Sequence, residues 1–334
     1  MAGTHVWHTQ QWRDQAVTWA TRRLADLGLR VTGPPEQPHV RPWSTLLRIP
    51  TSDGPVWLKA SGPGTAYEAR ILQASQHWAV PQLPIPLAVD ADRAWLLLAD
   101  AGSPLRRELA TSRNLRQWLA ILPEYAQVQM ALTPRVGEML ALGVPDLRPR
   151  TVPTHYTRLL SDHVWLRLGA SDGISRDDLH RLRQLTPQIT RWSEQLEALG
   201  ISPTLQHDDF HDGNVFVRRS SRGVAYVFLD WGDASVAHPF GTLLASLRNV
   251  ATWMDEPVDH KLLGALRDAY LEPWTAHYDR ADLLDAVRWA TRLAKVGRAL
   301  AWRRALTGAN GTERATYAEF VAGWLRDLLA DDSW

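Results

Sequence analysis

The chain has 334 residues, of which 45% are hydrophobic and 22% charged, and its formal net charge is +1. This composition is typical of a folded globular protein and excludes extensive disorder, and the length suits about two domains. The small net charge excludes an overall basic field for recruiting nucleic acid or anionic lipid. Cysteine is absent, which excludes disulfides, thiolate metal sites and a cysteine nucleophile.

The N-terminal segment lacks the apolar core of a secretory signal, and no later apolar run is long enough to span a bilayer. Local charged patches stay compatible with the small net charge. We therefore expect a cytoplasmic protein with neither a membrane nor a nucleic acid as its partner.

Residues 1–99 carry the patterns of a small, sheet-rich domain. Apolar residues at helical spacing predict a helix over Thr9–Leu29, and the proline-rich stretch after it predicts an irregular segment. A further helix is expected near Glu68, with Thr65 as its N-cap. Two pairs of apolar runs flank short turns and predict β-hairpins; the runs are TLLRIP with VWLKA, and IPLAVD with AWLLLAD.

Residues 100–110 contain glycine and proline and are interpreted as a connector, and residues 111–334 as a larger, mostly helical domain. One hairpin, VFV with YVFLD, is embedded in it. A sheet-rich domain followed by a helical one is an α+β architecture. The predicted helices are Asn114–Leu132, Thr154–Leu168, Arg176–Leu199, His260–Tyr270, Asp279–Leu306 and Thr312–Leu329.

The densest polar segment is HDDFHDGN, residues 207–214, which lies between apolar flanks. A zinc site is one interpretation, because His207 and His211 are four residues apart. However, H-E-x-x-H requires a helix and a glutamate after the first histidine, where this chain has Asp208. A polar turn is a second interpretation, which explains the composition but not the spacing.

A phosphotransferase loop is the third interpretation, and it accounts for the spacing. His207, Asp209 and Asn214 match H-x-D-x-x-x-x-N, in which the aspartate receives or orients the acceptor hydroxyl and the asparagine binds Mg²⁺. A second Mg²⁺-binding aspartate should end a following strand, and Asp230 does so. The predicted hairpin would return Asp230 to the neighbourhood of Asn214.

A kinase-like N-terminal domain also needs a lysine on a strand for the nucleotide phosphates, held by a glutamate of the next helix. Lys59 is the only lysine in the first 260 residues and lies in the run VWLKA. Glu68 lies in the helix that is predicted to follow. Taken alone, Lys59 could be an exposed lysine of an edge strand, and Glu68 could be an acid on a helix surface. The occurrence of both residues upstream of the loop favours phosphate binding.

The loop and its continuation resemble the H-G-D-L-H-x-G-N motif and the following DW of the aminoglycoside phosphotransferase family, which belongs with the choline kinases. His211, Gly213 and Trp231 carry this resemblance beyond the general kinase pattern, and it spans residues 40 to 250 or so. The resemblance implies a bilobal protein-kinase-like fold, with a small sheet-rich N-lobe and a larger helical C-lobe. It also implies that the chain uses ATP and Mg²⁺ to phosphorylate a hydroxyl of a small molecule.

The resemblance assigns roles to further residues. Main-chain atoms at Leu98, Asp100 and Ala101 would contact adenine. His207 and His211 would support the loop rather than contact the substrate.

The chain also departs from the family pattern in three places. Asp208 stands where the family usually has glycine, which adds a negative charge near the metal site. No Gly-rich phosphate loop is visible, so Ser44 and Thr45 are the candidates for hydrogen bonds to phosphate. Thr242 stands where the family often has an acid.

The acceptor is expected to be a cationic, hydroxyl-bearing small molecule, with an aminoglycoside or amino sugar as the leading candidate. Asp208, Asp212 and Asp233 supply more carboxylates than catalysis requires, and surplus negative charge favours ammonium groups. The residues assigned to the acceptor site are Asp233, Trp253, Asp255 and Glu256.

Two alternatives stay open. The acceptor could be choline, homoserine or a macrolide-like compound, or the chain could be a catalytically silent protein that only binds nucleotide. An anionic acceptor could use a group of arginines near the C-terminus, although these more simply form the solvated face of a helix; they are Arg292, Arg298, Arg303 and Arg304.

Overall fold

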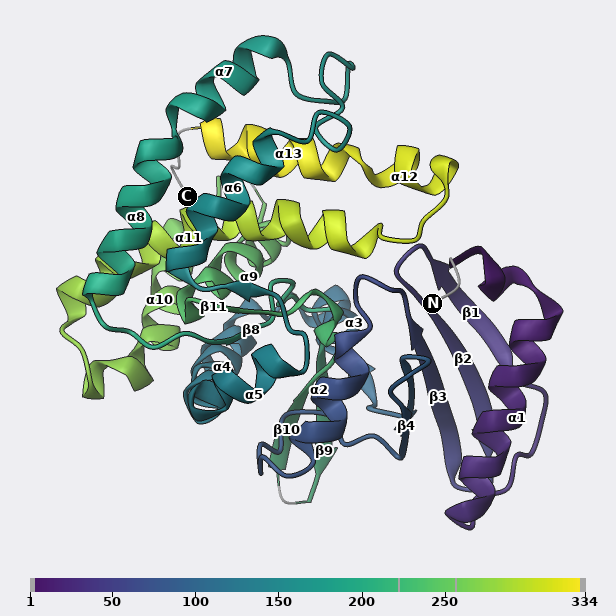
Figure 1. Ribbon diagram of the computed structural model, residues 1–334. Helices are drawn as coiled ribbons and strands as arrows, with labels where there is room; N and C mark the ends of the chain where they lie inside the picture. The colour runs from purple at the N-terminus through teal and green to yellow at the C-terminus, as the bar shows by residue number, and fades with distance from the viewer. Residues whose placement is uncertain (1–3, 222, 256, 331–334) are drawn as a thin grey trace. The chain divides into compact units, whose positions relative to one another are not determined.

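The computed structural model describes residues 4–221, 223–255 and 257–330. The chain folds into two compact units, one rich in β-sheet and one mostly helical (Figure 1). None of the helices within the described residues is long and apolar enough to cross a membrane.

The first unit comprises the chain up to Gly102 together with two later segments, Val217–Gly232 and Arg304–Tyr317. The second unit comprises the rest of the chain. Sequence patterns gave no sign that these two later segments pack with the N-terminal part. The domain boundaries at residues 99 and 110 stay a prediction.

A five-stranded antiparallel sheet, in the order β1-β2-β3-β5-β4, forms the centre of the first unit. Both predicted hairpins, β2–β3 and β4–β5, are confirmed. Lys59 lies in the central strand, opposite Leu46 of β2 and Leu96 of β5. The strands are β1 (Glu36–Arg41), β2 (Ser44–Thr51), β3 (Gly54–Ser61), β4 (Ala88–Asp90) and β5 (Trp95–Ala99).

One helix, α1 (Gln10–Asp26), packs against this sheet (Figure 1). The Thr9 hydroxyl caps it by accepting a hydrogen bond from the Trp12 N–H at 3.3 Å. Ala16, Ala20 and Leu24 follow at intervals of four and are fully buried against apolar residues of β2, β3 and β5. The predicted N-terminal helix is therefore confirmed.

Two local predictions in the first unit are wrong. Glu36–Arg41 is not irregular but forms β1, and Pro38 is tolerated there because β1 is an edge strand. Thr65 does not cap the following helix, α2 (Tyr67–Ser75). Its hydroxyl instead donates to the carbonyl of Trp43 at 3.2 Å, and Ala66 occupies the cap position.

The second unit is mostly helical, as predicted. The stretch Arg176–Leu199 forms two helices instead of one, because Pro187 starts a new first turn, where its missing N–H costs nothing. Two helices inside the second unit, α5 and α9, were not predicted, and α3 begins inside the expected connector. The helix expected over Thr154–Leu168 ends at Leu160, and the one expected over Thr312–Leu329 is divided into α12 and α13. The helices are α3 (Leu105–Ser112), α4 (Trp118–Leu132), α5 (Val136–Ala141), α6 (Val152–Leu160), α7 (Arg176–Gln184), α8 (Thr186–Ala198), α9 (Thr242–Ala251), α10 (His260–Leu271), α11 (Arg280–Ala305) and α13 (Glu319–Leu329), while α12 (Gly311–Tyr317) belongs to the first unit.

A small sheet of very short strands, in the order β7-β11-β8, also lies in the second unit and escaped prediction. β11 (Ser235–Ala237) pairs antiparallel with β8 (Thr204–Gln206) and parallel with β7 (Asp146–Leu147). β8 ends just before residue 207. The predicted hairpin, β9 (Val215–Ser220) with β10 (Gly223–Phe228), is present and begins just after residue 214. The polar segment 207–214 is therefore held by a strand at each end.

Candidate active site

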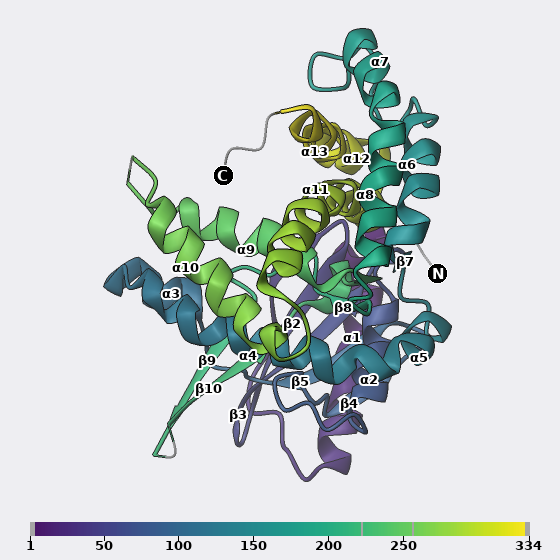
Figure 2. The same cartoon turned by 90° about the vertical axis from the view of Figure 1, so that its left-hand side faces the viewer.

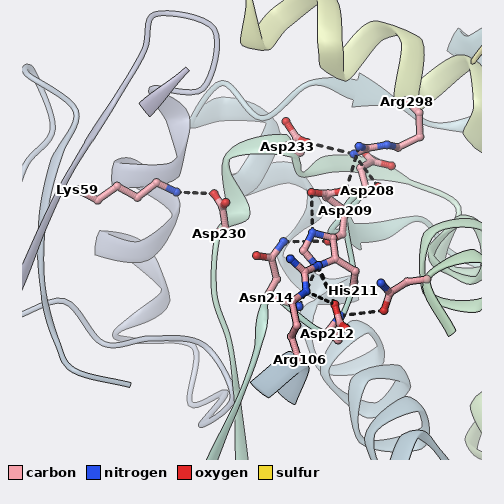
Figure 3. Close-up of polar contacts among 12 residues, drawn as sticks. Lys59, Arg106, Asp208, Asp209, His211, Asp212, Asn214, Asp230, Asp233 and Arg298 are labelled. Atoms are coloured by element: carbon pink, nitrogen blue, oxygen red, sulfur yellow. Dashed lines mark hydrogen bonds and ion pairs between the residues drawn. The ribbon is translucent and has the colours of Figure 1, made fainter. Parts of the chain in front are cut away.

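Lys59 is buried and contacts two carboxylates of the first unit, those of Glu68 and Asp230; Figure 3 shows the contact with Asp230. Its Nζ lies 2.8 Å from Oε1 and 2.7 Å from Oε2 of Glu68, and 2.5 Å from Oδ1 of Asp230. Burial alone would lower the pKa of Lys59, but the carboxylates of Asp230 and Glu68 raise it above the ordinary value. The lysine is therefore cationic, and the predicted pairing of Lys59 with Glu68 is present.

Glu68 also ties its helix to the segment that carries Asp230. The Trp231 N–H donates to Oε1 at 3.0 Å, and the Ser61 hydroxyl donates to Oε2 at 3.1 Å. Burial raises the pKa of Glu68, and Lys59 counters that shift. One turn of α2 thus positions both Lys59 and the Asp230-Trp231 dipeptide.

Asp230 adopts a left-handed backbone conformation, with φ of +65°. A non-glycine residue rarely adopts this conformation, and such residues gather at functional sites. Its contact with Lys59 joins positions that are remote in the sequence, and no sequence pattern indicates it.

The segment 207–214 in the second unit rests on an aromatic stack. Phe210 is fully buried and stacks on Tyr125 of α4, with ring centroids 3.9 Å apart. The Tyr125 hydroxyl accepts a hydrogen bond from the backbone N–H of His207 at 3.0 Å. His207 is fully buried, and its supporting role stays a prediction.

Asp209 is held from two sides (Figure 3). Its Oδ1 lies 2.9 Å from Nη2 of Arg298, and its Oδ2 lies 3.3 Å from Nε2 of His211. Burial would raise the pKa of Asp209, but the Arg298 guanidinium and the His211 ring hold that pKa well below its usual range. The Asp209 side chain is still 31% exposed, so an ionised carboxylate is accessible to a ligand.

His211 orients toward Asp209 because of its backbone neighbour. The Gly213 N–H donates to Nδ1 at 2.9 Å, which leaves Nε2 to carry the proton directed at Asp209. Burial would lower the pKa of His211, but the hydrogen bond to Asp209 raises it. A Cβ at position 213 would lie 2.8 Å from Cε1 of His211, so a larger residue there would force the imidazole ring to shift.

Asp212 is an internal anchor. It is fully buried, and its Oδ1 accepts two hydrogen bonds from Arg106, at 3.0 and 2.8 Å. The Trp253 Nε1 donates to Oδ2 at 2.7 Å, and the Asp212 N–H donates to Oδ1 of Asn249 at 3.2 Å. Trp253 was predicted to lie in the acceptor site, but its indole N–H donates to Asp212 of the loop.

Asp208 shows why glycine suits this position. Its φ of +63° lies in the left-handed region. The side chain is buried, and its Oδ2 accepts a short hydrogen bond from the hydroxyl of Ser235 in β11. The backbone carbonyl of Asp208 accepts a hydrogen bond from Arg298 at 2.9 Å. The extra carboxylate therefore has partners within the protein.

Asn214 presents one atom of the right type for a hard cation. Its amide nitrogen donates to the carbonyl of Asp209 at 3.0 Å, which leaves the amide oxygen Oδ1 for a metal. Asp230, the second predicted ligand, has a carboxylate with its side chain 49% exposed. Both donor types suit Mg²⁺. Within the described residues, no group of three or more His, Cys, Asp or Glu side chains is arranged to hold a metal ion.

The residues predicted to contact phosphate and adenine lie in the sheet-rich unit. Ser44 is buried at the start of β2, directly after the two-residue turn from β1. The Thr45 hydroxyl already donates to the carbonyl of His39 at 2.8 Å, so this donor is used within the protein. Leu98 lies in β5, and Ala101 is buried beyond it.

Asp100 forms a turn at the end of β5. Its Oδ1 accepts a hydrogen bond from the Gly102 N–H at 2.8 Å, and its Oδ2 accepts one from the Trp57 indole at 2.9 Å. The nucleotide-binding roles of these residues stay predictions.

The described residues among those predicted for the acceptor site make different contacts, and their role stays a prediction. Asp233 is engaged with Arg298, whose Nη1 lies 3.1 Å from its Oδ2. Asp255 is exposed, and Glu256 lies outside the described residues. Asp259, in the same acidic stretch, caps α10 by accepting from the N–H groups of Lys261 and Leu262 at 3.0 Å each.

Arg298 is the residue that sequence reasoning assigned wrongly. It is not part of a solvated face but is 6% exposed, between Asp209, Asp233 and the Asp208 carbonyl. The sequence signal that could have indicated burial is the run of apolar residues that follows it in α11, of which Ala299 and Ala301 are fully buried. Arg106 was missed as well, and no pattern marks it.

These arrangements can be compared with known proteins. The model of the phosphotransferase enzyme family matches residues 39–284. The chain belongs to this family, and the predicted phosphotransferase acting on a hydroxyl of a small molecule is confirmed. No curated protein matches the chain in a sequence comparison.

Solved structures share the fold. A macrolide 2′-phosphotransferase type I aligns with a TM-score of 0.57 and 16% identity, covering 95% of this chain and 97% of the other. An ethanolamine kinase from Plasmodium vivax gives 0.60 and 11%, covering 89% and 82%. A choline kinase from Cryptosporidium parvum gives 0.57 and 10%, covering 89% and 88%. The predicted α+β, protein-kinase-like fold class is therefore confirmed.

Proposed function

We propose that the chain transfers the γ-phosphoryl group of ATP to a hydroxyl of a small molecule, with Mg²⁺ as cofactor. The observation that carries this proposal is the accessible, ionised carboxylate of Asp209, held by Arg298 and His211. In the reaction the acceptor oxygen bonds to the γ-phosphorus and the bond from that phosphorus to ADP breaks. The hydroxyl proton passes to Asp209 or to solvent.

Asp209 acts mainly by orientation. A carboxylate whose pKa lies well below the ordinary value is a weak base, so it does not deprotonate an alcohol in the ground state. It accepts the hydrogen bond of the acceptor hydroxyl and aims one oxygen lone pair at the phosphorus. Arg298 and His211 fix the carboxylate so that this orientation costs no rearrangement when the acceptor binds.

Lys59 is the proposed phosphate-binding cation. The carboxylates of Glu68 and Asp230 keep it charged and fix the direction of Nζ. Main-chain groups at Leu98, Asp100 and Ala101 would contact the adenine.

Asn214 and Asp230 would hold Mg²⁺ through their side-chain oxygens. A bound Mg²⁺ ion would neutralise the negative charge of the phosphate groups. Asn214 itself links this role to catalysis, because its amide nitrogen is hydrogen-bonded to the backbone of Asp209.

The choice of acceptor is the finer part of the proposal. The surplus carboxylates that favoured a cation have protein partners: Asp208 has Ser235, Asp212 has Arg106, and Asp233 has Arg298. The charge argument for an aminoglycoside or amino sugar is weaker for this reason. We keep aminoglycosides as one candidate class beside choline, ethanolamine, homoserine and macrolides.

Two measurements separate a working kinase from a silent nucleotide-binding protein. Calorimetry with ATP and Mg²⁺ measures binding, and ADP release across the candidate acceptors measures turnover. We expect binding together with acceptor-dependent ADP release. Binding without turnover on any acceptor would favour the silent protein.

A further inference from the structure

The turn between β1 and β2 stands where protein kinases have a Gly-rich loop that covers the nucleotide phosphates. It consists of two residues, Pro42 and Trp43, because Arg41 pairs directly with Ser44. Pro42 has no N–H to donate, and the Trp43 carbonyl accepts from the Gly62 N–H at 2.7 Å. A turn this short offers few main-chain donors, so side chains have to supply most of the contacts to phosphate.

The two hydroxyls expected to bind phosphate are poorly placed for this task. Ser44 is only 5% exposed. Thr45 is fully buried and pairs with Val40 of β1 and Ala60 of β3, which pack in the apolar core beneath α1. Thr45 therefore lies on the face of the sheet that α1 covers, whereas Lys59, which precedes Ala60 in β3, points to the opposite face.

His39 and Arg41 of β1 lie on the same face of the sheet as Lys59. His39 is opposite Leu46 of β2, and Leu46 is opposite Lys59 of β3. Residues directly opposite each other in antiparallel strands point to one face, and so do residues two apart in a strand. Val40, between His39 and Arg41, packs against the core on the other face. Figure 2 shows β2, β3 and β5 of this sheet together with α1.

The charges of the Lys59 group act on the His39 ring. Burial and the Arg41 guanidinium lower the pKa of His39, the Asp230 carboxylate raises it, and Lys59 lowers it. The ring therefore lies near both Arg41 and the Lys59–Asp230 ion pair. As a neutral imidazole, it has one N–H to donate.

The Lys59 group lacks the positive charge that a nucleoside triphosphate requires. Lys59 forms ion pairs with two carboxylates, those of Glu68 and Asp230, so the three side chains together carry a net negative charge. Arg41 is exposed, and no carboxylate within the described part of the chain forms an ion pair with it. Its guanidinium presents a planar set of donors that matches the oxygens of a phosphate.

We propose that Arg41 binds the terminal phosphates of the nucleotide through its guanidinium, with the His39 ring donating a further hydrogen bond, in place of the main chain of a Gly-rich loop. This inference rests on the proposed use of ATP. It adds two residues of β1, within the sheet-rich unit, that recognise the triphosphate.

Calorimetry with ATP–Mg²⁺ and with AMP tests the role of Arg41. Arg41→Gln should bind ATP about five- to tenfold more weakly than the wild type, because it loses charge-assisted hydrogen bonds at an exposed position. Its affinity for AMP should not change, because AMP lacks the terminal phosphates. The deficit for ATP should also shrink as the salt concentration rises, since salt screens an exposed charge.

Matched variants separate a local contact from loss of charge or of structure. Arg22→Gln removes an exposed arginine from α1, on the covered face of the sheet, and should bind ATP as the wild type does. His39→Phe removes the donor and should weaken ATP binding about threefold, within the range for a neutral hydrogen bond. His39→Gln keeps an N–H donor and should recover most of that loss.

The possible failures are distinguishable. If the wild type binds ATP and folded Arg41→Gln binds it equally well, the role of Arg41 is refuted while the proposed function stands. An equal loss of affinity for ATP and AMP, or the same loss in Arg22→Gln, would also refute a contact with the terminal phosphates. Absence of ATP binding by the wild type would refute the proposed function and this inference together.

Discussion

Nη2 of Arg298 lies 2.9 Å from Oδ1 of Asp209, and the same guanidinium contacts Asp233 and the backbone carbonyl of Asp208 (Figure 3). A long helix thus places a buried cation against the loop that carries the proposed catalytic carboxylate. Because the arginine is 6% exposed, its interactions are screened little by solvent. Arg298 is a positioning residue, since it acts through Asp209.

Replacing Arg298 by Met should affect both stability and the pH dependence of turnover. Loss of a buried cation leaves carboxylates uncompensated, which costs about 3–5 kcal/mol for fully buried pairs and less here because Asp209 is partly exposed. The pKa of Asp209 should rise toward its ordinary value, so the acidic limb of the kcat/KM profile should move to higher pH.

Urea unfolding and the pH–rate profile measure these two effects of Arg298→Met. Arg298→Lys keeps the charge and should retain much of the wild-type profile. Arg303→Met, farther along the same helix and paired with Asp162, is the matched control. A wild-type acidic limb in folded Arg298→Met would contradict the positioning role.

Substitutions in the Lys59–Glu68 pair should affect protein stability and ATP binding differently. Lys59→Met leaves Glu68, 1% exposed, with a buried unpaired charge, so it should destabilise the protein by about 3–5 kcal/mol. Lys59→Met combined with Glu68→Gln should recover most of this loss. The amide oxygen can still accept from the Trp231 N–H, which lies 3.0 Å from Oε1 of Glu68, and the amide nitrogen can donate to the Ser61 hydroxyl, which lies 3.1 Å from Oε2.

ATP–Mg²⁺ calorimetry on the same variants decides the role of Lys59. The double variant should be stable but bind ATP weakly. Lys261→Met, at an exposed lysine of α10, is the control for loss of a lysine. Full recovery of ATP affinity in the double variant would show that Lys59 does not bind phosphate.

Local sequence patterns predicted the elements that depend on neighbouring residues. The α1 helix and the β2–β3 hairpin follow from spacing and turn chemistry, and both are present. The β7-β11-β8 sheet escaped prediction because strands of two or three residues carry no readable period. β1 was missed because proline suggests a break, although an edge strand accepts it.

The backbone at Asp208 predicts opposite outcomes for two substitutions. Its φ is +63°, so Asp208→Gly should relieve strain and offset the lost hydrogen bond to Ser235, leaving stability within about 1 kcal/mol of wild type. Asp208→Val places a β-branched residue in the left-handed region and should cost a further ~1–3 kcal/mol. Thermal unfolding of both variants measures the difference. Equal melting temperatures would argue against the left-handed backbone.

His238 should make the protein less stable in acid. Burial lowers its pKa from 6.5 to about 3, so below about pH 6.5 the unfolded chain binds a proton that the folded chain excludes. Stability is then lost as the pH falls from about 6.5 toward 3, at up to ~1.4 kcal/mol per pH unit.

His238→Asn removes this titration while keeping an acceptor for the Phe240 N–H, which the histidine Nδ1 accepts at 3.3 Å. Urea unfolding at about pH 7 and about pH 5 compares the two proteins. The variant should lose less stability between these two conditions than the wild type. A loss as large in the variant would show that His238 does not exclude a proton.

Sequence spacing identified the loop of the candidate site but not what holds it. His207, Asp209 and Asn214 follow a pattern within eight residues, which a sequence displays directly. Arg298 and Arg106 reach the loop only through tertiary packing of α11 and α3, and an arginine on a helix is usually exposed. The charge of the acceptor could not be predicted from the sequence for the same reason, because the pairing of each carboxylate depends on residues far away in the chain.

The most direct test of the phosphotransferase account is turnover by Asp209→Ala on the acceptor that the screen selects. Transfer from ATP labelled at the γ-phosphate to the acceptor, followed by mass spectrometry of the product, measures the reaction itself. The account predicts that the wild type adds one phosphoryl group to a hydroxyl and that folded Asp209→Ala does so about 10²–10⁴-fold more slowly. Near-wild-type transfer by Asp209→Ala would contradict it.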